Sequence, residues 1–412
     1  MVFRALLVLL VGVLAGGVRA SDDGAWLVWD GKLGVVRGDL AGIDERGVRL
    51  VDEHGLDVSV GDAVAMVLPE DRAGKVLRLG DVHRVRATTF EALVTLTDGQ
   101  VWEADILDGG SDDLSLRVRW LGRVDVPLDV VRSVVMVGGE ADAFDARIFG
   151  ALDEEMGGLD SVALENGDVV RGTVLSIGDV VEVEGDSGTV RVGRSSVRRI
   201  GLVNPGLGAP PMRVWFSSGS VIGARGFGGG GASGWVIEAV RGDVDKGDLV
   251  ELGKVVVSDG GAVLVGVEFS PNRLVAFSSL EVDGYVPEGG RRWTVGPGVY
   301  PGGSRLGLDD VVFPGPMVAR FVLPDGAVRV SGVFRAGEKA GAWTDCRVRL
   351  EQGGEVLWEG RIRRGAEAGA FSVKVDGGED LTVRVSAGAY GPVEDRVVLG
   401  LGWVLLGETD GG

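Results

Sequence analysis

The chain has 412 residues, a formal net charge of −19, two histidines and one cysteine. Its hydrophobic fraction of 45% and charged fraction of 25% are typical of a globular protein with real cores. So acidic a surface disfavours nucleic-acid phosphates and anionic lipids as partners. The negative charge is compatible with neutral glycans, cations or basic proteins as ligands. The alternative is that the charge serves only to keep the protein soluble. Zinc, haem and iron–sulfur sites need several His or Cys ligands, so we expect no cofactor.

The first residues have the pattern of a secretory signal peptide. Arg4 gives a positive n-region, residues 5–13 are apolar, and small residues precede Ser21. We predict a signal peptide over residues 1–20 and a secreted, periplasmic or cell-envelope location. No second long apolar segment follows, so no stable membrane insertion is expected after cleavage. An uncleaved N-terminal anchor is the alternative.

Glycine is unusually frequent, at 72 residues, and separates short valine-rich runs. Valine favours strands and glycine favours tight turns, so the composition predicts an all-β protein. Asp-Gly or Asn-Gly turns recur between apolar residues, and Gly31, Gly99 and Gly167 are spaced 68 residues apart. Such turns are strong hairpin signals, assigned here to type I′. About five short strands follow each turn.

Short strands at even spacing are typical of small closed barrels, which hide their edges. The rhythm resembles SH3-like or Sm-like barrels. The predicted fold is therefore all-β, with tandem small β-barrels followed by a C-terminal jelly-roll-like β-sandwich. One continuous β-array over residues 24–280 is the alternative. The predicted domains are a signal peptide (1–20), barrel repeats at 24–70, 90–138, 160–204 and 212–280, and a sandwich at 281–408.

Two connecting segments have a distinct character. Residues 141–156 carry apolar side chains at helical spacing, which predicts a short helix packed on a barrel or bound to a partner. Residues 226–231 are Gly-Phe-Gly-Gly-Gly-Gly, which we interpret as a flexible loop. No Lys-Ser or Lys-Thr follows this run, so it is not a phosphate-binding loop.

Beyond Trp293 the predicted strands become longer, as expected for a two-sheet sandwich. Three segments of this region resemble the NPCBM family, a carbohydrate-binding module noted in glycoside hydrolases. They are residues 346–360, 371–385 and 390–406, each similar to a strand segment of that family. The resemblance implies a β-sandwich that binds sugars. The family's early Gly-x-Gly-x-His stretch corresponds here to residues 309–316, which contain no His.

Sugar binding uses aromatic faces together with a few polar side chains on loops. Trp343 and Tyr390 are flanked by Gly and polar residues, which indicates loops, so both are candidate glycan-binding residues. Trp358 lies within a predicted strand and is a further candidate. Trp403 lies in an apolar run and is expected in the core.

Catalytic patterns are sparse. His54 and His83 lie outside any nucleophile motif and are interpreted as loop histidines. Cys346 lies in a strand-like alternation and is expected to be a small buried hydrophobe. We predict no enzyme activity and no catalytic residue. A glycosidase needs only two carboxylates, so an unrecognised hydrolase is a third hypothesis.

Two acidic pairs, Asp309-Asp310 and Glu394-Asp395, are positions where structural calcium is possible. No EF-hand loop accompanies them, so no metal site is predicted. The sequence favours a secreted, non-catalytic protein whose C-terminal sandwich binds a neutral glycan. The alternative is an envelope or extracellular scaffold that binds other proteins and no sugar.

Overall fold

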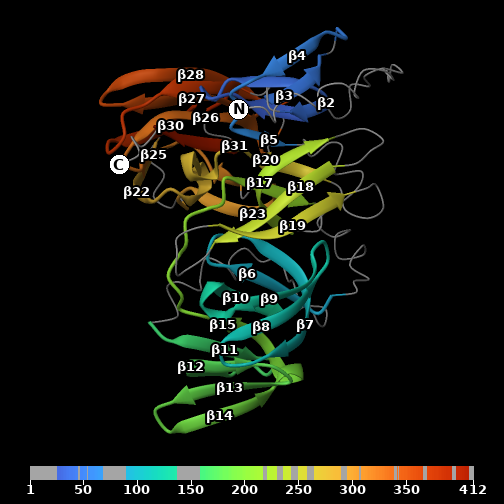
Figure 1. Ribbon diagram of the computed structural model, residues 1–412. Helices are drawn as coiled ribbons and strands as arrows, with labels where there is room; N and C mark the ends of the chain where they lie inside the picture. Colours follow the sequence, from blue (N-terminus) through green and yellow to red (C-terminus); the bar gives the residue numbers. More distant parts are fainter. Residues whose placement is uncertain are drawn as a thin grey trace.

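The computed structural model is all-β. It describes residues 26–44, 47–52, 54–67, 90–136, 158–216, 220–229, 235–242, 249–257, 264–288, 295–305, 308–337, 341, 343–364, 369–391 and 396–407. Over these ranges the helical elements are three-residue 3-10 turns, and none is long and apolar enough to cross a membrane. The predicted all-β fold class is confirmed (Figure 1). The predicted signal peptide lies outside the described residues.

The first twenty strands form four units with one plan. In each unit the first strand pairs antiparallel with both the second and the fifth, as β1 does with β2 and β5. Unit 1 contains β1 (Trp26–Trp29), β2 (Val35–Asp44), β3 (Gly47–Val51), β4 (Asp57–Val60) and β5 (Ala65–Val67). Unit 2 contains β6 (Ala92–Leu96), β7 (Val101–Gly109), β8 (Asp113–Val118), β9 (Gly122–Pro127) and β10 (Val131–Met136).

The other two units repeat this plan. Unit 3 contains β11 (Asp160–Leu164), β12 (Val169–Ile177), β13 (Val180–Gly185), β14 (Gly188–Gly193) and β15 (Val197–Gly201). Unit 4 contains β16 (Met212–Phe216), β17 (Val221–Gly229), β18 (Trp235–Gly242), β19 (Leu249–Val257) and β20 (Leu264–Glu268). A 3-10 turn, η1 (Leu128–Val130) or η2 (Arg194–Ser196), precedes the last strand of units 2 and 3.

The recurring glycine turns differ in type from the prediction. Gly99 and Gly167 have φ values of +84° and +90°, while Asp98 and Asn166 before them are not in the left-handed region. Leu96 accepts from the Gly99 N–H and donates to the carbonyl of Gln100. This is a three-residue loop in which glycine takes the left-handed position, instead of type I′. In the first unit Leu33, with φ of 51°, takes that conformation in place of Gly31.

The units associate in an order that differs from their order in the sequence. β5 pairs with β20, joining unit 1 to unit 4, and β10 pairs with β15, joining unit 2 to unit 3. A contact between Val101 of β7 and Val221 of β17 links the two pairs. Figure 1 shows the resulting column, with unit 1 at one end and unit 3 at the other. All twenty strands thus belong to one hydrogen-bonded sheet system.

Each pair of units also shares its hydrophobic core. One cluster joins Trp102 and Leu116 of unit 2 to Val181 and Ile200 of unit 3, and another joins Val28 of unit 1 to residues of unit 4. Shared cores and cross-unit strand pairing mean that the described units are packed together, beyond simple tandem linkage. The division into separate barrels stays a prediction.

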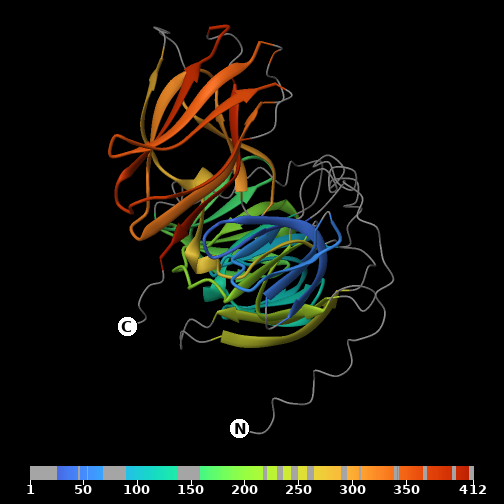
Figure 2. The ribbon, with the colours of Figure 1, turned by 90° about the horizontal axis from the view of Figure 1, so that it is seen from above.

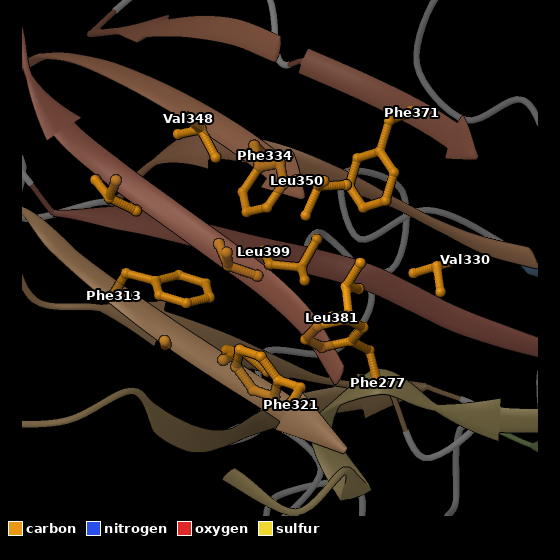
Figure 3. Close-up of a cluster of buried hydrophobic side chains, with 14 of the residues drawn as sticks. Phe277, Phe313, Phe321, Val330, Phe334, Val348, Leu350, Phe371, Leu381 and Leu399 are labelled. Carbon is orange, nitrogen blue, oxygen red and sulfur yellow. The ribbon is translucent and has the colours of Figure 1, made fainter. Parts of the chain in front are cut away.

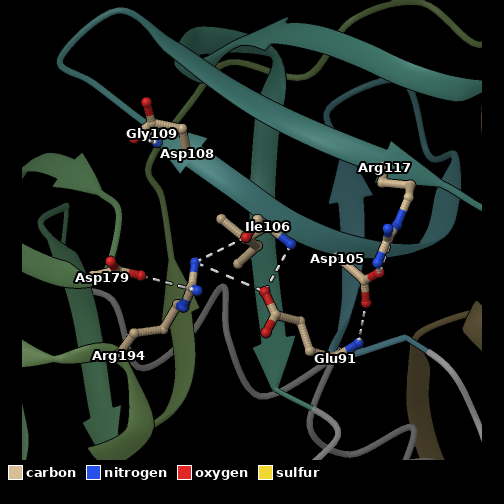
Figure 4. A network of polar contacts seen from close by, with 8 residues as sticks. All are labelled: Glu91, Asp105, Ile106, Asp108, Gly109, Arg117, Asp179 and Arg194. Atoms are coloured by element: carbon tan, nitrogen blue, oxygen red, sulfur yellow. Dashed lines mark hydrogen bonds and ion pairs between the residues drawn. The ribbon is translucent and has the colours of Figure 1, made fainter.

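A polar network reinforces the contact between units 2 and 3 (Figure 4). Arg194 of η2 donates to the Ile106 carbonyl at 3.0 Å and lies 3.7 Å from a Glu91 carboxylate oxygen. Glu91 in turn accepts from the Ile106 N–H at 2.7 Å. Asp179, which is 3.2 Å from Arg194, completes the cluster. The guanidinium therefore satisfies backbone and side-chain acceptors of both units.

The junction of units 2 and 4 is held by the buried amide of Gln100. Its Nε2 donates to Asp98 and to the Val240 carbonyl, at 2.8 and 2.9 Å. Its Oε1 accepts from Trp102 Nε1 and from the Gly223 N–H, at 3.1 and 2.7 Å. The side chain is fully buried and uses both ends of the amide, as a buried polar group requires.

The C-terminal region is a sandwich of two antiparallel sheets. One has the order β23-β24-β31-β26-β29, with β21 also paired to β31, and the other has the order β22-β25-β30-β27-β28. The strands are β21 (Leu274–Ala276), β22 (Val282–Pro287), β23 (Gly298–Arg305), β24 (Leu308–Phe313), β25 (Met317–Val322), β26 (Ala327–Ala336), β27 (Asp345–Gln352), β28 (Glu355–Arg363), β29 (Gly369–Lys374), β30 (Asp380–Ala387) and β31 (Val397–Leu406).

Alternating residues of both sheets fill the space between them (Figure 3). The core contains Phe313, Phe321 and Phe334, with Val348 and Leu350 facing them from β27. Cys346 is fully buried in the same core, as predicted. Inward residues on β27 therefore alternate with outward ones, and the sheet's outer face is left for polar side chains.

The sandwich packs against unit 1 through a smaller apolar cluster. Trp403 and Leu405 of β31 meet Trp29 and Leu33 of unit 1. Trp403 is buried as predicted, at the junction with unit 1 instead of between the two sheets. Figure 2 shows the sandwich (orange to red) as a distinct body beside the repeat units. The sandwich thus has an apolar contact with the repeats, so its stability depends partly on them.

Two predictions about connecting segments have different outcomes. The predicted loop at residues 226–231 is wrong over Gly226–Gly229, which belong to β17 and pair with β18. Glycine has no side chain to favour a strand, but hydrogen bonds from a neighbouring strand determine the conformation here. The predicted helix at residues 141–156 lies outside the described residues.

Candidate functional site

The register of two neighbouring strands brings Trp343 and Tyr390 together. Cys346 at the start of β27 pairs with Ala387 at the end of β30. Trp343 lies three residues before Cys346, and Tyr390 lies three residues after Ala387. Because the strands are antiparallel, both aromatic residues emerge at the same end of the sheet.

The two rings form an exposed pair. Their centroids are 5.3 Å apart and their planes are inclined at 74°, an edge-to-face contact. Trp343 is 59% exposed and Tyr390 57% exposed. An aromatic pair is normally buried, and one that leaves over half of each side chain accessible presents apolar ring surface to a ligand. We call Trp343 and Tyr390 the aromatic pair.

The buried carboxylate of Asp345 fixes the base of this pair. Arg361 donates to both carboxylate oxygens at 2.6 Å, and Arg363 donates to one of them at 3.2 Å. The Ala389 N–H donates to the same carboxylate at 2.9 Å. The Arg361 hydrogen bond is the largest cause that holds the pKa of Asp345 well below its ordinary value, so the group is ionised at all physiological pH values.

The turn that carries Tyr390 approaches Asp345 very closely at Gly388. The Gly388 N–H donates to the Asp345 carbonyl at 2.7 Å. A Cβ at position 388 would lie 2.2 Å from that carbonyl oxygen and 2.5 Å from the carboxyl carbon. Glycine is therefore required for this approach, and the turn at residues 388–391 is held directly against β27.

The outer face of β27 and β28 beside the aromatic pair is rich in arginine. Arg347 pairs in register with Arg361, and Asp345 pairs with Arg363. Glu359 lies 2.6 Å from Arg349 and 3.4 Å from Arg347. These two strands therefore place four guanidinium groups around two carboxylates.

The third candidate, Trp358, lies away from the aromatic pair. It is opposite Leu350 on β28, on the inward face of the sheet. Its ring stacks on Phe334 at a centroid distance of 5.5 Å and contacts Phe371 at the same distance. The side chain is half-buried against the sandwich core. Its position assigns it a packing role.

The remaining candidates of the sequence do not gather into a site. His54 is exposed in the turn before β4, and its N–H donates to Asp52. Asp310 bonds to Arg335 on the sandwich. Among the described residues, no group of three or more His, Cys, Asp or Glu side chains is placed to hold a metal ion. His83 and the acidic pair at 394–395 lie outside the described residues.

No protein-family model matches the chain, and no curated protein sequence matches it. Among solved structures, it is similar to CBM51 from Clostridium perfringens GH95 in complex with methyl-galactose. The match has 15% identity and a TM-score of 0.26, covering 32% of this chain and 99% of that one. A carbohydrate-binding module CBM36 in complex with calcium and xylotriose matches at 9% identity and a TM-score of 0.20, over 32% and 96% of the two chains.

A third solved structure contains two such modules, the tandem CBM51 modules of the family 98 glycoside hydrolase from Streptococcus pneumoniae. It matches at 11% identity and a TM-score of 0.26, over 60% of this chain and 88% of that one. These solved structures are all carbohydrate-binding modules, but the likeness is distant. The predicted NPCBM and SH3-like relationships stay predictions. We therefore base the proposed function on the geometry of the aromatic pair.

Sequence reasoning located the two exposed aromatic residues but not the groups that hold them. Asp345, Arg361, Arg363 and Gly388 escaped attention because their importance depends on strand register. The strand pattern gave no signal, because Asp345 is in phase with the polar positions Arg347 and Arg349, while Cys346, Val348 and Leu350 are the apolar positions of β27.

Proposed function

We propose that the C-terminal sandwich binds a glycan, with a sugar ring lying on the aromatic pair. The exposed edge-to-face contact of Trp343 with Tyr390 carries this proposal. Sugar rings have apolar C–H faces, so covering exposed aromatic surface with a sugar removes apolar area from water. The half-exposed side chains of Arg361 and Arg363 supply polar groups beside the rings, as a specific site requires.

The site is built for binding and has a rigid base. Trp343 precedes β27 and Tyr390 follows β30, and these two strands are neighbours in the sheet. The Asp345 carboxylate joins β27 to β28 and to the turn at 388–391. Such preorganisation lowers the entropy cost of holding a ligand. We propose that the protein acts as a non-catalytic binding protein, secreted after cleavage before Ser21. Mass determination of the mature N-terminus tests the cleavage.

A glycan array probed with the full chain tests the binding proposal. The full chain is the right sample because the sandwich packs on unit 1 through Trp403 and Leu405. We expect binding that both Trp343→Ala and Tyr390→Ala weaken. Tyr285→Ala is the matched control, since Tyr285 is 44% exposed on β22 of the same sandwich. A well-folded chain that binds no glycan, or one whose binding ignores both substitutions, would refute the proposal.

The expected size of the effect follows from the exposed area. A buried Trp side chain removes roughly 150–250 Å² from water, and Trp343 is 59% exposed. If a sugar covers half of that exposed surface, about 70 Å² is buried, which is worth about 1.8 kcal/mol. Trp343→Ala should therefore weaken binding about 20-fold.

A protein-binding scaffold is the second candidate function. β14 pairs with β13 alone among the described strands, and most of its residues are exposed. Such an edge can accept a strand from a partner protein. This function would be favoured if the full chain captured a specific extracellular protein in a pull-down, the Val190→Lys variant on β14 did not, and the full chain bound no glycan.

A further inference from the structure

The charge around the aromatic pair has the opposite sign to that of the whole chain. The net charge of −19 predicts a neutral ligand. At the end of β27 and β28 that adjoins the pair, however, Arg361 and Arg363 share the single carboxylate of Asp345, which leaves one positive charge in excess among these three side chains. Nearby charges act over about 8 Å at physiological salt, so a ligand on the aromatic pair meets this local excess first.

Both of these arginines retain hydrogen-bonding capacity beside the pair. Arg361 uses Nε and Nη2 on the Asp345 carboxylate, and Arg363 uses Nε. Within the described ranges, Nη1 of Arg361 and both Nη atoms of Arg363 donate to no protein acceptor. Both side chains are 51% exposed. Planar guanidinium donors of this kind match the geometry of a carboxylate.

The guanidinium groups and the aromatic pair belong to one local structure. Asp345 accepts from both arginines and from the N–H of Ala389, the residue before Tyr390. The hydrogen bond to Asp345 is the main cause of the raised Arg361 pKa. The same carboxylate thus positions the rings and orients the two arginines.

Resting on the proposed glycan binding, we infer that the sugar held by the aromatic pair is acidic and that its carboxylate is bound by Arg361 and Arg363. Asp345 neutralises one of these two guanidinium groups, and the sugar carboxylate neutralises the other. Stacking on Trp343 and Tyr390 then holds the ring, while the arginines select the charge. Because this charge contact is exposed to solvent, its strength falls with added salt.

Matched glycans test the inference with the full chain. The probes are oligosaccharides that end in a uronic or sialic acid, and the same oligosaccharides after reduction of the carboxyl group to an alcohol. We expect at least tenfold tighter binding of an acidic probe at low salt, with the preference shrinking as salt is added. Arg363→Gln should remove the preference, since Arg363 makes one 3.2 Å bond to Asp345 and is less tied to the fold than Arg361.

Arg320→Gln is the matched control. Arg320 lies on β25 of the same sheet, is 56% exposed and pairs with one carboxylate, Asp283. We expect it to keep the acidic preference. Equal binding of acidic and reduced probes, both weakened by Trp343→Ala, would overturn the inference and leave the proposed function standing. Loss of all glycan binding would refute both, and preference for a sulfated probe over the carboxylated one would overturn the carboxylate assignment.

Discussion

Removing the Asp345 carboxylate should loosen the turn that carries Tyr390. Asp345→Ala deletes the acceptor of the bonds from Arg361, Arg363 and the Ala389 N–H. The two arginines are half exposed and regain water, so the cost falls below the 3–5 kcal/mol typical of breaking a fully buried pair. Loss of charge-assisted bonds and of the amide's acceptor leaves about 2–3 kcal/mol.

Hydrogen exchange measures this directly. The amides of Gly388 and Ala389 donate to Asp345, so local opening of the turn exposes them. A loss of about 2 kcal/mol corresponds to exchange about 30-fold faster at these amides. Glu359→Ala is the matched control, because Glu359 also lies between two arginines of this sheet but is 40% exposed. It should cost less than about 1 kcal/mol. Equal effects of the two substitutions would refute the assigned role of Asp345.

The pH dependence has a definite sign. The pKa of Asp345 is lower in the folded state than in the unfolded state, where it is about 3.9. Its contribution is therefore fully present above that value and is lost as the pH falls below it. Faster exchange of the 388–391 turn should appear only under strongly acidic conditions, and not between pH 5 and 8.

Three other predictions concern packing and buried polar groups. Gly388→Ala places a Cβ against the Asp345 carbonyl and should lower the free energy of unfolding by about 1–3 kcal/mol, as measured by denaturation. It should also weaken glycan binding, and an unchanged stability would contradict the close approach. Burial raises the pKa of Glu268, so the protonated form favours folding, and the stability of the fold declines as the pH rises through that raised pKa. Between pH 4 and 8 the melting temperature should therefore decline less in Glu268→Gln than in the unsubstituted chain. Gln100→Ala orphans Trp102 Nε1 and the Gly223 N–H at the junction of units 2 and 4 and should cost about 2–4 kcal/mol, whereas a loss under 0.5 kcal/mol would show that water replaces the amide.

Much of the fold follows from local sequence signals, whereas the site depends on register. Valine alternation and glycine turns predicted an all-β chain, and flanking Gly and polar residues indicated that Trp343 and Tyr390 lie in loops. The turn type was missed because Asp98 and Asn166 occur in both two-residue and three-residue hairpin loops, which differ in their hydrogen bonds. The association of unit 1 with unit 4 could not be predicted, because edge pairing between distant strands leaves no local pattern.

Trp358 illustrates the limit for side chains. Its sequence surroundings resemble those of an exposed strand residue, and the inward orientation follows from its pairing with Leu350 across the β27–β28 hairpin. A shift by one residue in that register would turn Trp358 outward and Arg361 inward. The arginine-rich face beside the aromatic pair was hidden for the same reason.

The central claim is that Trp343 and Tyr390 form a glycan-binding surface. The most direct measurement compares the full chain with the Trp343→Ala/Tyr390→Ala double variant on a glycan array, with exchange protection of β27 and β30 confirming that both are folded. The account predicts a defined set of glycans bound by the full chain and lost in the double variant. The same glycans bound equally by both proteins, or no glycan bound by the folded full chain, would contradict it.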